Sequence, residues 1–343
     1  LGLSQRDLAA RVGYAPSMIR KIESDERQPS EQTARQLTLG VSLVVLLFAV
    51  LATIAFDAGG ERFQLTTSVS WIPDFGVDFA LGVDGIALVM LLLIGVLVPV
   101  VVVASWREEA TGRRSMRAFW AWLLLLESMM VGVFAATDVF LFYVFFEAML
   151  VPMYFLIGSF GGPRRQYAAV KFFLYSLLGG LVMLAAVIGL YVVSANQLGE
   201  GTFAFDALRQ IEIDPGVQKL LFLGFFVAFA IKAPLVPFHT WLPDSGAEAP
   251  IGGAVLLVGV LDKVGTFGFI RYCLPLFPDA SRYFAPVVLV LAVAGILYAA
   301  LLAMGQSDMK RLVSYTSIAH FGFIALGIFA FTTEATTGAV LYM

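Results

Sequence analysis

The chain has 343 residues, of which 59% are hydrophobic and only 14% are charged. An average soluble domain has roughly a quarter of its residues charged, so this composition excludes an ordinary soluble enzyme and indicates a protein of the bilayer. The formal net charge of −3 is small and indicates no class of partner on its own. The single cysteine, Cys273, excludes an intrachain disulfide and a cysteine-based metal cluster.

The first 38 residues are polar and favour short helices, unlike a cleavable signal peptide. Gly13 closes a first helix, Pro16 and Ser17 open a second, and Ser30 and Glu31 start a third. The segment resembles the helix-turn-helix domains of the Cro/lambda-repressor (Xre) class through three motifs, namely Leu3-Ser4-Gln5-x-x-Leu8-Ala9-x-x-x-Gly13, Ile19-x-x-Ile22-Glu23 and Arg27-x-Pro29-Ser30.

In that class the second helix enters the major groove of DNA, which implies that Ser17, Arg20 and Lys21 would contact DNA. The first and last helices of the class have no counterpart here, and about 38 residues seldom bury enough surface to fold alone. We therefore expect residues 1–38 to be a non-functional partial helix-turn-helix joined to a membrane protein. DNA binding is the less favoured alternative.

Long apolar runs dominate the rest of the chain. A hydrocarbon core about 30 Å thick is crossed by a helix of about 20 apolar residues. Nine such runs lie at roughly 39–56, 81–105, 118–136, 139–159, 169–194, 218–239, 251–274, 284–305 and 312–331, and a tenth begins near Ala335. We predict an all-α polytopic membrane domain over residues 39–343, with about nine to ten transmembrane helices.

The loops between these runs alternate in charge. Residues 107–117, 161–167 and 306–311 are basic, whereas 57–80 and 195–217 carry most of the acidic residues. The three basic loops fall on one side of the membrane, and the positive-inside rule places that side in the cytoplasm. The same reasoning predicts a cytoplasmic N-terminus.

Ionisable side chains inside the apolar runs are candidate functional residues, because each costs about 3 kcal/mol or more at the centre of a membrane helix unless it meets a partner or water. Glu147 lies in the apolar stretch 140–150, and Lys232 lies in the stretch 228–239. Burial disfavours a charge and an opposite charge favours it, so such a pair can exchange a proton. The alternatives are a static ion pair and, for Lys232, an ammonium that reaches the surface.

Two prolines follow Lys232 at positions 234 and 237. Because proline lacks a backbone donor, Pro234 and Pro237 predict a break in this helix. Carbonyl groups freed at a break can bind water or a cation at membrane depth, as in transporters with interrupted helices.

Lys263 directly follows Asp262 in the seventh run. Successive helical residues point about 100° apart, so we expect Asp262 to meet a different neighbour from that of Lys263. For Asp262, a purely structural contact remains an alternative.

His239 and His320 are the two histidines of the chain, and neither has a second ligand at metal spacing, so we expect no metal site. His320 follows three hydroxyl residues, 315–317, which can hold water for a proton relay; a hydrogen-bonded core histidine is the alternative. No phosphate-binding loop, Rossmann glycine pattern or cysteine cluster is present, so we expect the chain to bind no redox cofactor.

Three segments carry the most specific signal, namely Phe145-Phe146-Glu147-Ala148-Met149-Leu150-Val151-Pro152-Met153-Tyr154, Lys232-Ala233-Pro234-Leu235-Val236-Pro237-Phe238-His239-x-Trp241-Leu242-Pro243-Asp244 and Tyr315-Thr316-Ser317-Ile318-Ala319-His320-Phe321-Gly322. They resemble the antiporter-like membrane subunits of bacterial proton-pumping NADH:quinone oxidoreductase, respiratory complex I. The resemblance covers residues from about 39 to 343. It implies two inverted helix repeats, each with a broken helix, of which the first, about 118–274, is whole and the second is truncated from about 284.

The resemblance further implies a role for each ionisable residue. Glu147 and Lys232 would form the paired switch of the first half-channel, Lys263 would be the central relay, and His320 would continue the path towards the second repeat. Accessory positions on the same hydrophilic axis would be Glu127, Lys171 and His239.

The implied function is proton translocation coupled to quinone reduction, as a subunit of a translocase in the bacterial plasma membrane. NADH, FMN, iron–sulfur clusters and quinone would belong to other subunits, and the partners would be other membrane subunits, especially neighbouring antiporter-like ones. One alternative is a subunit of a multisubunit Na⁺/H⁺ antiporter or of a membrane-bound hydrogenase, which share these motifs. Another is a membrane-tethered DNA-binding regulator.

Overall fold

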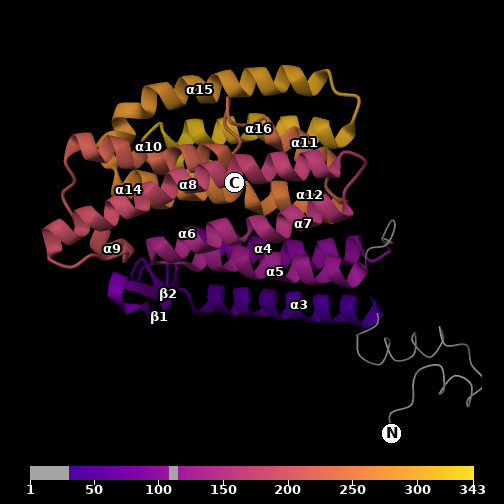
Figure 1. Cartoon of the computed structure of the whole chain (residues 1–343), viewed down its shortest axis with the longest axis horizontal. Coiled ribbons are helices and arrows are strands. Elements are labelled where there is room, and N and C mark those ends of the chain that lie inside the picture. The colour runs from indigo at the N-terminus through magenta and orange to yellow at the C-terminus, as the bar shows by residue number, and fades with distance from the viewer. Residues whose placement is uncertain (1–30, 108–114) are drawn as a thin grey trace, which may run out of the picture.

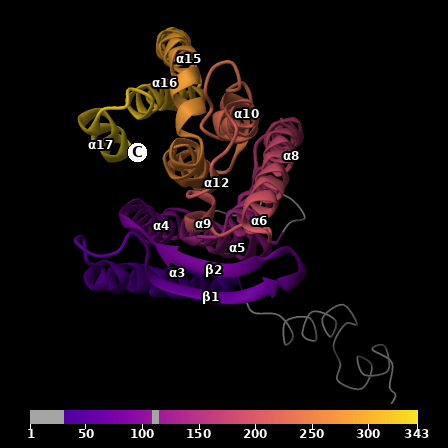
Figure 2. The same cartoon turned by 90° about the vertical axis from the view of Figure 1, so that its left-hand side faces the viewer.

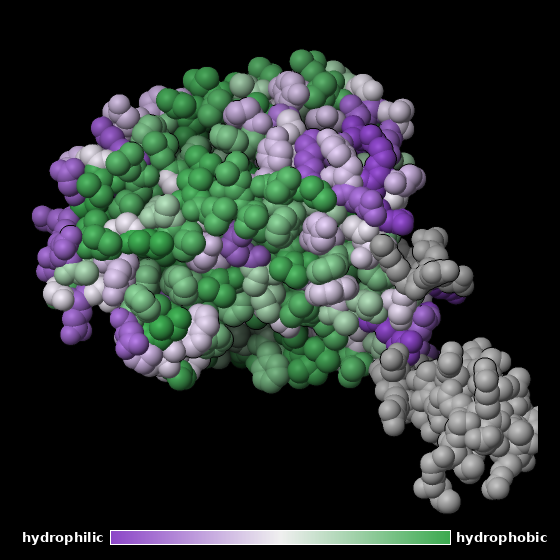
Figure 3. Space-filling model, viewed as in Figure 1, coloured by the Kyte–Doolittle hydropathy of each residue, from purple (hydrophilic) through white to green (hydrophobic). Residues whose placement is uncertain are grey.

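The computed structural model of the chain describes residues 31–107 and 115–343, which form a bundle of roughly parallel and antiparallel helices (Figures 1 and 2). Nine spans within these residues are long and apolar enough to cross a membrane. Hydrophobic side chains cover the middle of one face of the bundle, and hydrophilic side chains gather towards its two ends (Figure 3). The predicted polytopic helical fold is confirmed.

Each predicted apolar run corresponds to one span. The spans are α3 (Glu31–Ala55), α4 (Gly85–Ala104), α5 (Met116–Ala135), α6 (Val139–Ala148) with α7 (Leu150–Phe160), α8 (Arg165–Leu198), α10 (Pro215–Lys232), the segment Ile251–Leu276, α15 (Pro278–Met304) and α16 (Met309–Ile328). Ile251–Leu276 comprises α12 (Ile251–Leu256), the π-helix η2 (Leu257–Leu261), α13 (Lys263–Gly268), the π-helix η3 (Phe269–Cys273) and α14 (Leu274–Leu276). The other elements are β1 (Gln64–Ile72), the 3₁₀ turn η1 (Pro73–Phe75), β2 (Val77–Val83), α9 (Phe205–Leu208), α11 (Trp241–Glu248) and α17 (Thr333–Tyr342).

The helix α3 runs without interruption through the expected boundary at residue 38. The third helix predicted from Ser30 and Glu31 and the first apolar run at 39–56 are therefore one element, because no proline separates them and the single Gly40 is tolerated within the helix. The residues predicted to contact DNA, Ser17, Arg20 and Lys21, lie outside the described residues.

A β-hairpin covers one end of the bundle, where the sequence indicated only an acidic loop. Strands β1 and β2 pair antiparallel, with Thr67 opposite Leu81 and Val69 opposite Phe79. The Thr and Val residues of β1 favour the extended backbone. At the tip Gly76 has φ 59° and lies so close to the loop 199–204 that a Cβ there would be 2.5 Å from the carbonyl oxygen of Gly201. The hairpin thus closes over the loop between α8 and α10.

A buried ion pair fastens the end of this hairpin to the irregular seventh span. Arg271 of η3 lies 2.6 Å from Asp84, which directly follows β2, and the Arg271 side chain is only 2% exposed. The guanidinium is also stacked between the rings of Phe63 and Phe267, 4.9 and 4.8 Å from their centres. Removing one partner of such a pair would leave an uncompensated buried charge, so the contact fixes the hairpin on the bundle.

Aspartates set the starts of several helices. Asp84, Asp138, Asp214 and Asp308 each accept a hydrogen bond from a backbone amide in the first turn of α4, α6, α10 and α16 respectively. These contacts satisfy amide donors that the helix itself leaves unpaired. Asp138 differs from Asp214 because it is buried beneath the hairpin, whereas Asp214 is exposed.

We expect Asp138→Asn to change how stability depends on pH. Burial raises the pKa of the Asp138 carboxyl from 3.8 to about 6, although the amides of Leu141 and Asp78 donate hydrogen bonds that lower it. Because the folded-state pKa is the higher one, the contribution of this group to stability is largest below about pH 4 and is lost as the pH rises through about 6. The thermal midpoint of the wild-type chain in detergent should therefore fall more between about pH 4.5 and about pH 7 than that of the variant.

Unfolding can be followed by reaction of a thiol dye with the buried Cys273. Asp214→Asn is the matched control, since it changes an exposed residue with the same capping role. Equal pH slopes for the wild type and the Asp138 variant would contradict the prediction.

Candidate functional site

Lys232 is the last residue of α10, and the chain leaves the helix immediately after it. Helix resumes at Trp241, so the break predicted at Pro234 and Pro237 is confirmed. The indole Nε1 of Trp241 donates a hydrogen bond, 2.9 Å long, to the carbonyl oxygen of Ile231. This contact ties the second half of the broken helix, α11, back to the end of the first.

The ammonium group of Lys232 lies in the protein interior beside aromatic rings. The residue is 1% exposed, and its Nζ lies 5.2 Å from the ring centre of Phe146 and 5.6 Å from that of Phe172. Nζ has no hydrogen-bond partner among the described residues. The two opposite charges that act on it belong to Glu147 and Asp262. The alternative of an ammonium that reaches the surface is therefore excluded.

Glu147 reaches this interior from α6, and α8 provides the space for it. A Cβ at Gly180 would overlap Oε1 of Glu147, so the carboxylate occupies the volume that any other residue at position 180 would fill. One and two turns earlier on the same face of α8 lie Ser176, whose buried hydroxyl has no partner among the described residues, and Phe172, which contacts Lys232. The face of α8 at positions 172, 176 and 180 thus lines the space between the two charges.

Asp262 and Lys263 approach from the seventh span, between two π-helical segments. Nζ of Lys263 donates a hydrogen bond of 3.2 Å to the carbonyl oxygen of Val258, which lies in η2. The charge of Asp262 acts on both Lys263 and Lys232. The structure therefore brings together Glu147, Lys232, Asp262 and Lys263, with carboxylates and amines alternating.

These four groups are near one another but are not closed into contact ion pairs. The ion pairs within 4.0 Å among the described residues involve none of the four. A proton can therefore move between neighbours only through a bridging water or after a side chain rotates. The alternative of a static contact pair between Glu147 and Lys232 does not describe this structure.

Lys171 takes part in a different cluster, in the second turn of α8, which begins at the basic loop 161–167. Its Nζ lies 2.7 Å from Asp244 of α11, and the other oxygen of Asp244 pairs with Arg311 of α16. Asp244 thereby joins α8, α11 and α16. Lys171 is therefore paired with Asp244 rather than with the groups around Lys232, and its accessory role stays a prediction.

The two histidines occupy different surroundings. His239 is buried in the turn between α10 and α11, with its ring 5.2 Å from that of Tyr298 and its Nδ1 without a partner among the described residues. His320 lies on an exposed face of α16 and stacks on Tyr342 of α17, with ring centres 5.4 Å apart. Within the described residues, His320 is therefore not a core histidine. Its role in the path towards a second repeat stays a prediction.

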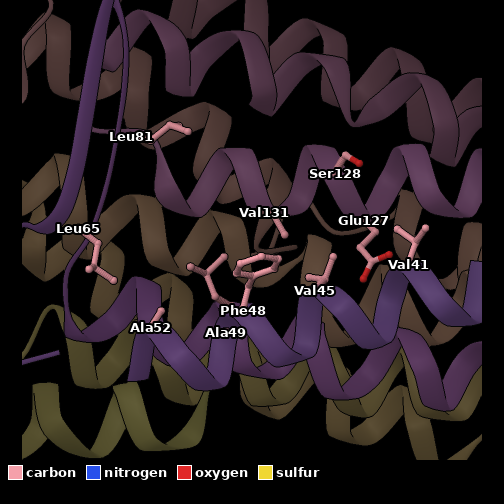
Figure 4. A pocket seen from close by; sticks show the side chains of 11 residues that line it. Val41, Val45, Phe48, Ala49, Ala52, Leu65, Leu81, Glu127, Ser128 and Val131 are labelled. Atoms are coloured by element: carbon pink, nitrogen blue, oxygen red, sulfur yellow. The ribbon is translucent and has the colours of Figure 1, made fainter. Parts of the chain in front are cut away.

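Glu127 lies apart from these groups, in an apolar groove between α3 and α5. Its carboxyl is directed towards Val41 and Val45 of α3 (Figure 4) and has no partner among the described residues. The structure brings it together with none of the other predicted site residues. Among residues 31–107 and 115–343, no cluster of three or more His, Cys, Asp or Glu side chains could hold a metal ion.

Two residues of this region, Gly180 and Asp244, were not candidates from the sequence. Gly180 could not be singled out because many glycines occur in the spans. Asp262 was a candidate with a structural contact as its alternative, and the neighbour it faces could not be predicted because that neighbour is distant in sequence. Asp244 lies within the most specific motif of the chain, 232–244, and its acidic side chain there was the available signal.

Most of the membrane-spanning part of the chain matches a known family. The family model described as "NADH:quinone oxidoreductase/Mrp antiporter, TM" matches residues 136–343. The chain belongs to this family. A second model, described as "Helix-turn-helix", matches residues 1–44, of which 31–44 lie in the continuous helix α3.

Two relatives are named as subunits M of NADH-quinone oxidoreductases. NADH-quinone oxidoreductase subunit M of Mycobacterium tuberculosis H37Rv is 50% identical over 336 residues, which cover 88% of this chain and 61% of the relative. The subunit M of Escherichia coli K12 is 42% identical over 315 residues, covering 90% of this chain and 61% of the relative. The chain thus spans about three fifths of the length of these relatives.

Solved structures share the fold. A chain of respiratory complex I from Thermus thermophilus has a TM-score of 0.77 and 33% identity, with 91% of this chain and 67% of that chain covered. A chain of the Mrp complex from Dietzia has the same TM-score at 23% identity, with 91% and 33% covered, and shows likeness of fold alone.

We expect Gly180→Ala to destabilise the protein through Glu147. The added methyl group would overlap the carboxyl group of Glu147, which supplies all three of the nearest atoms. Overpacking of this kind costs about 1 to 3 kcal/mol, and the thermal midpoint should fall accordingly. In a Glu147→Ala background the same glycine substitution should cost little, because the overlapping atoms are gone.

The matched control is Gly189→Ala on the same helix, where the new methyl group would meet only the mobile end of Leu221. Equal losses from Gly180→Ala with and without Glu147 would show that the glycine does not make room for that carboxylate.

Proposed function

We propose that this chain is a proton-conducting membrane part of an NADH:quinone oxidoreductase, and that proton movement through it is coupled to quinone reduction in other subunits. The observation that carries the proposal is the buried Lys232 at a helix break, with a carboxylate on either side. Identity of 50% and 42% to relatives named NADH-quinone oxidoreductase subunit M supports the choice of complex.

The alternation of charges gives Lys232 a proton affinity that its neighbours control. Two unit charges roughly 6 Å apart interact by about 3 kcal/mol at an effective dielectric constant of about 20, which is about a hundredfold in proton affinity. Deprotonated Glu147 therefore holds the ammonium form of Lys232, and neutralising Glu147 promotes release of the proton. A charge displaced elsewhere in the complex can drive the switch by acting on either member of the pair.

The redox groups of such a complex, NADH, FMN, iron–sulfur clusters and quinone, belong to its other subunits, and this chain contributes only the proton path. Its partners are other membrane subunits, especially neighbouring antiporter-like ones. The basic loops 161–167 and 306–311 lie at the end of the bundle opposite the hairpin (Figure 1). From the positive-inside rule we therefore expect the hairpin outside the bacterial plasma membrane and the N-terminal end of α3 in the cytoplasm.

An antiporter of the Mrp type is the nearest alternative within the family. The Dietzia Mrp chain shares the fold at 23% identity, whereas the relatives named as subunit M are about twice as similar in sequence. A DNA-binding role rests on residues 1–38, of which all but the start of α3 lie outside the described residues.

We expect Lys232→Ala to abolish coupled pumping. In inverted membrane vesicles from cells whose complex contains this chain, NADH-driven acidification should fall by about tenfold or more, since the proton has lost its acceptor at the break. Acidification is followed with a pH-sensitive fluorescent dye, and assembly is checked by NADH oxidation with an artificial electron acceptor.

Lys219→Ala is the matched control, because Lys219 lies at the other end of α10 against the ring of Tyr283. Normal acidification by the Lys232 variant at full assembly would refute the proposed function.

A further inference from the structure

We propose that Asp262 is a proton-relay residue that passes protons between Lys232 and Lys263. The proposal rests on the proposed function and adds a carboxyl group to the path between the two lysines. It follows from the orientation of Asp262, from its lack of a structural partner, and from the different helix that Lys263 faces.

The packing of α13 against α10 sets the direction of Asp262. A Cβ at Gly265 would lie 2.5 Å from the carbonyl oxygen of Phe229 and 2.5 Å from the amide nitrogen of Ala233, so this face of α13 touches the last turn of α10. Asp262 is three residues before Gly265 and shares that face. Its carboxyl is therefore directed towards the helix end that carries Lys232, whose charge acts on it.

Lys263 faces another neighbour. Its Nζ bonds the carbonyl oxygen of Val258 and lies 5.9 Å from the ring centre of Phe321 on α16. Adjacent residues of a helix point about 100° apart. Asp262 therefore faces α10, while the next residue, Lys263, faces α16. A proton that moves from one side chain to the other thus crosses from the broken helix to the next part of the bundle.

The partners of the other aspartates distinguish a relay from a structural role. Asp84 pairs with Arg271 and caps α4, Asp138 accepts two backbone hydrogen bonds, and Asp244 pairs with two cations. Asp262 is 0% exposed, and neither carboxyl oxygen has a hydrogen-bond partner among the described residues. A carboxyl group with a purely structural role would have hydrogen-bond or ion-pair partners, because an unpaired buried polar group destabilises the fold.

The transfer is a pair of proton shifts with no change in oxidation state. The N–H bond of the Lys232 ammonium breaks as an O–H bond forms on Asp262, leaving a neutral amine and a neutral acid. The acid then gives its proton to the neutral amine of Lys263, which becomes an ammonium, and the Asp262 carboxylate is restored. Both shifts pass through a bridging water or follow a rotation of the lysine side chain.

The test replaces Asp262 in the complex that contains this chain. Asp262→Asn keeps the size of the side chain but cannot take up and release a proton, and NADH-driven acidification of vesicles should fall by about tenfold. Asp262→Glu keeps a titratable carboxyl group and should recover most of the acidification. Loss in both variants at full assembly, or in neither, would overturn the relay role.

Lys232→Ala, measured beside these variants, separates this proposal from the proposed function. Loss of acidification with Lys232→Ala but not with Asp262→Asn would overturn the relay alone. Normal acidification with all of these variants would overturn both. Thr266→Val is the matched control for changes in the packing of α13, since it removes a buried hydroxyl from the same helix but no titratable group.

A second measurement needs neither pumping nor assembly. A hydrophobic carbodiimide reacts with protonated carboxyl groups in membranes, and the adducts on the purified chain are located by mass spectrometry. Lys232→Met removes the cation that Asp262 faces, so the adduct on Asp262 should form several times faster than in the wild type. An unchanged rate at Asp262 would overturn the assigned direction of its carboxyl towards Lys232.

Discussion

The structure is organised around one constraint, which is the burial of the Lys232 ammonium group inside a helix bundle. An isolated charge in such a place is destabilised by several kcal/mol. Here the compensation comes from two aromatic rings and from carboxylates on two different helices, rather than from one contact pair. Because no single partner neutralises the lysine, its charge stays sensitive to the protonation of Glu147 and of Asp262. A closed ion pair would be more stable and less able to exchange protons.

Small residues allow the helices to meet this constraint. Gly180 leaves room for the Glu147 carboxyl on α8, Gly265 lets α13 touch the backbone of α10 at the break, and Gly268 packs against the ring of Phe229. Helices in membranes usually associate by close approach through small residues. The hydrophobic effect does not drive this association, because the lipid tails are as apolar as the side chains. In this chain the same glycines also bring the ionisable side chains within reach of one another. The same glycine positions therefore determine both the packing of the helices and the arrangement of the ionisable side chains.

The sequence predicted what depends on local pattern and missed what depends on the direction of a side chain. Apolar runs gave the spans, and the prolines after Lys232 gave the helix break, because both act within a few residues. The hairpin at 64–83 was taken for a loop, since its short alternation lies among acidic residues. Depth in an apolar run also made Glu127 and His320 candidates alongside Lys232. Only the packing shows that Glu127 faces a groove beside α3, that His320 is exposed, and that Asp262 faces α10.

The helix α16 contacts the site at two levels, which joins the end of the bundle to its interior. Arg311 in its first turn pairs with Asp244, which also holds Lys171, while Phe321 lies beside Lys263. These two positions are ten residues apart, or about 15 Å along a helix. A rigid helix cannot shift at one contact without shifting at the other. Any displacement of α16 would therefore alter both the position of α11, the second half of the broken helix, and the surroundings of Lys263, which we propose receives the proton from Asp262.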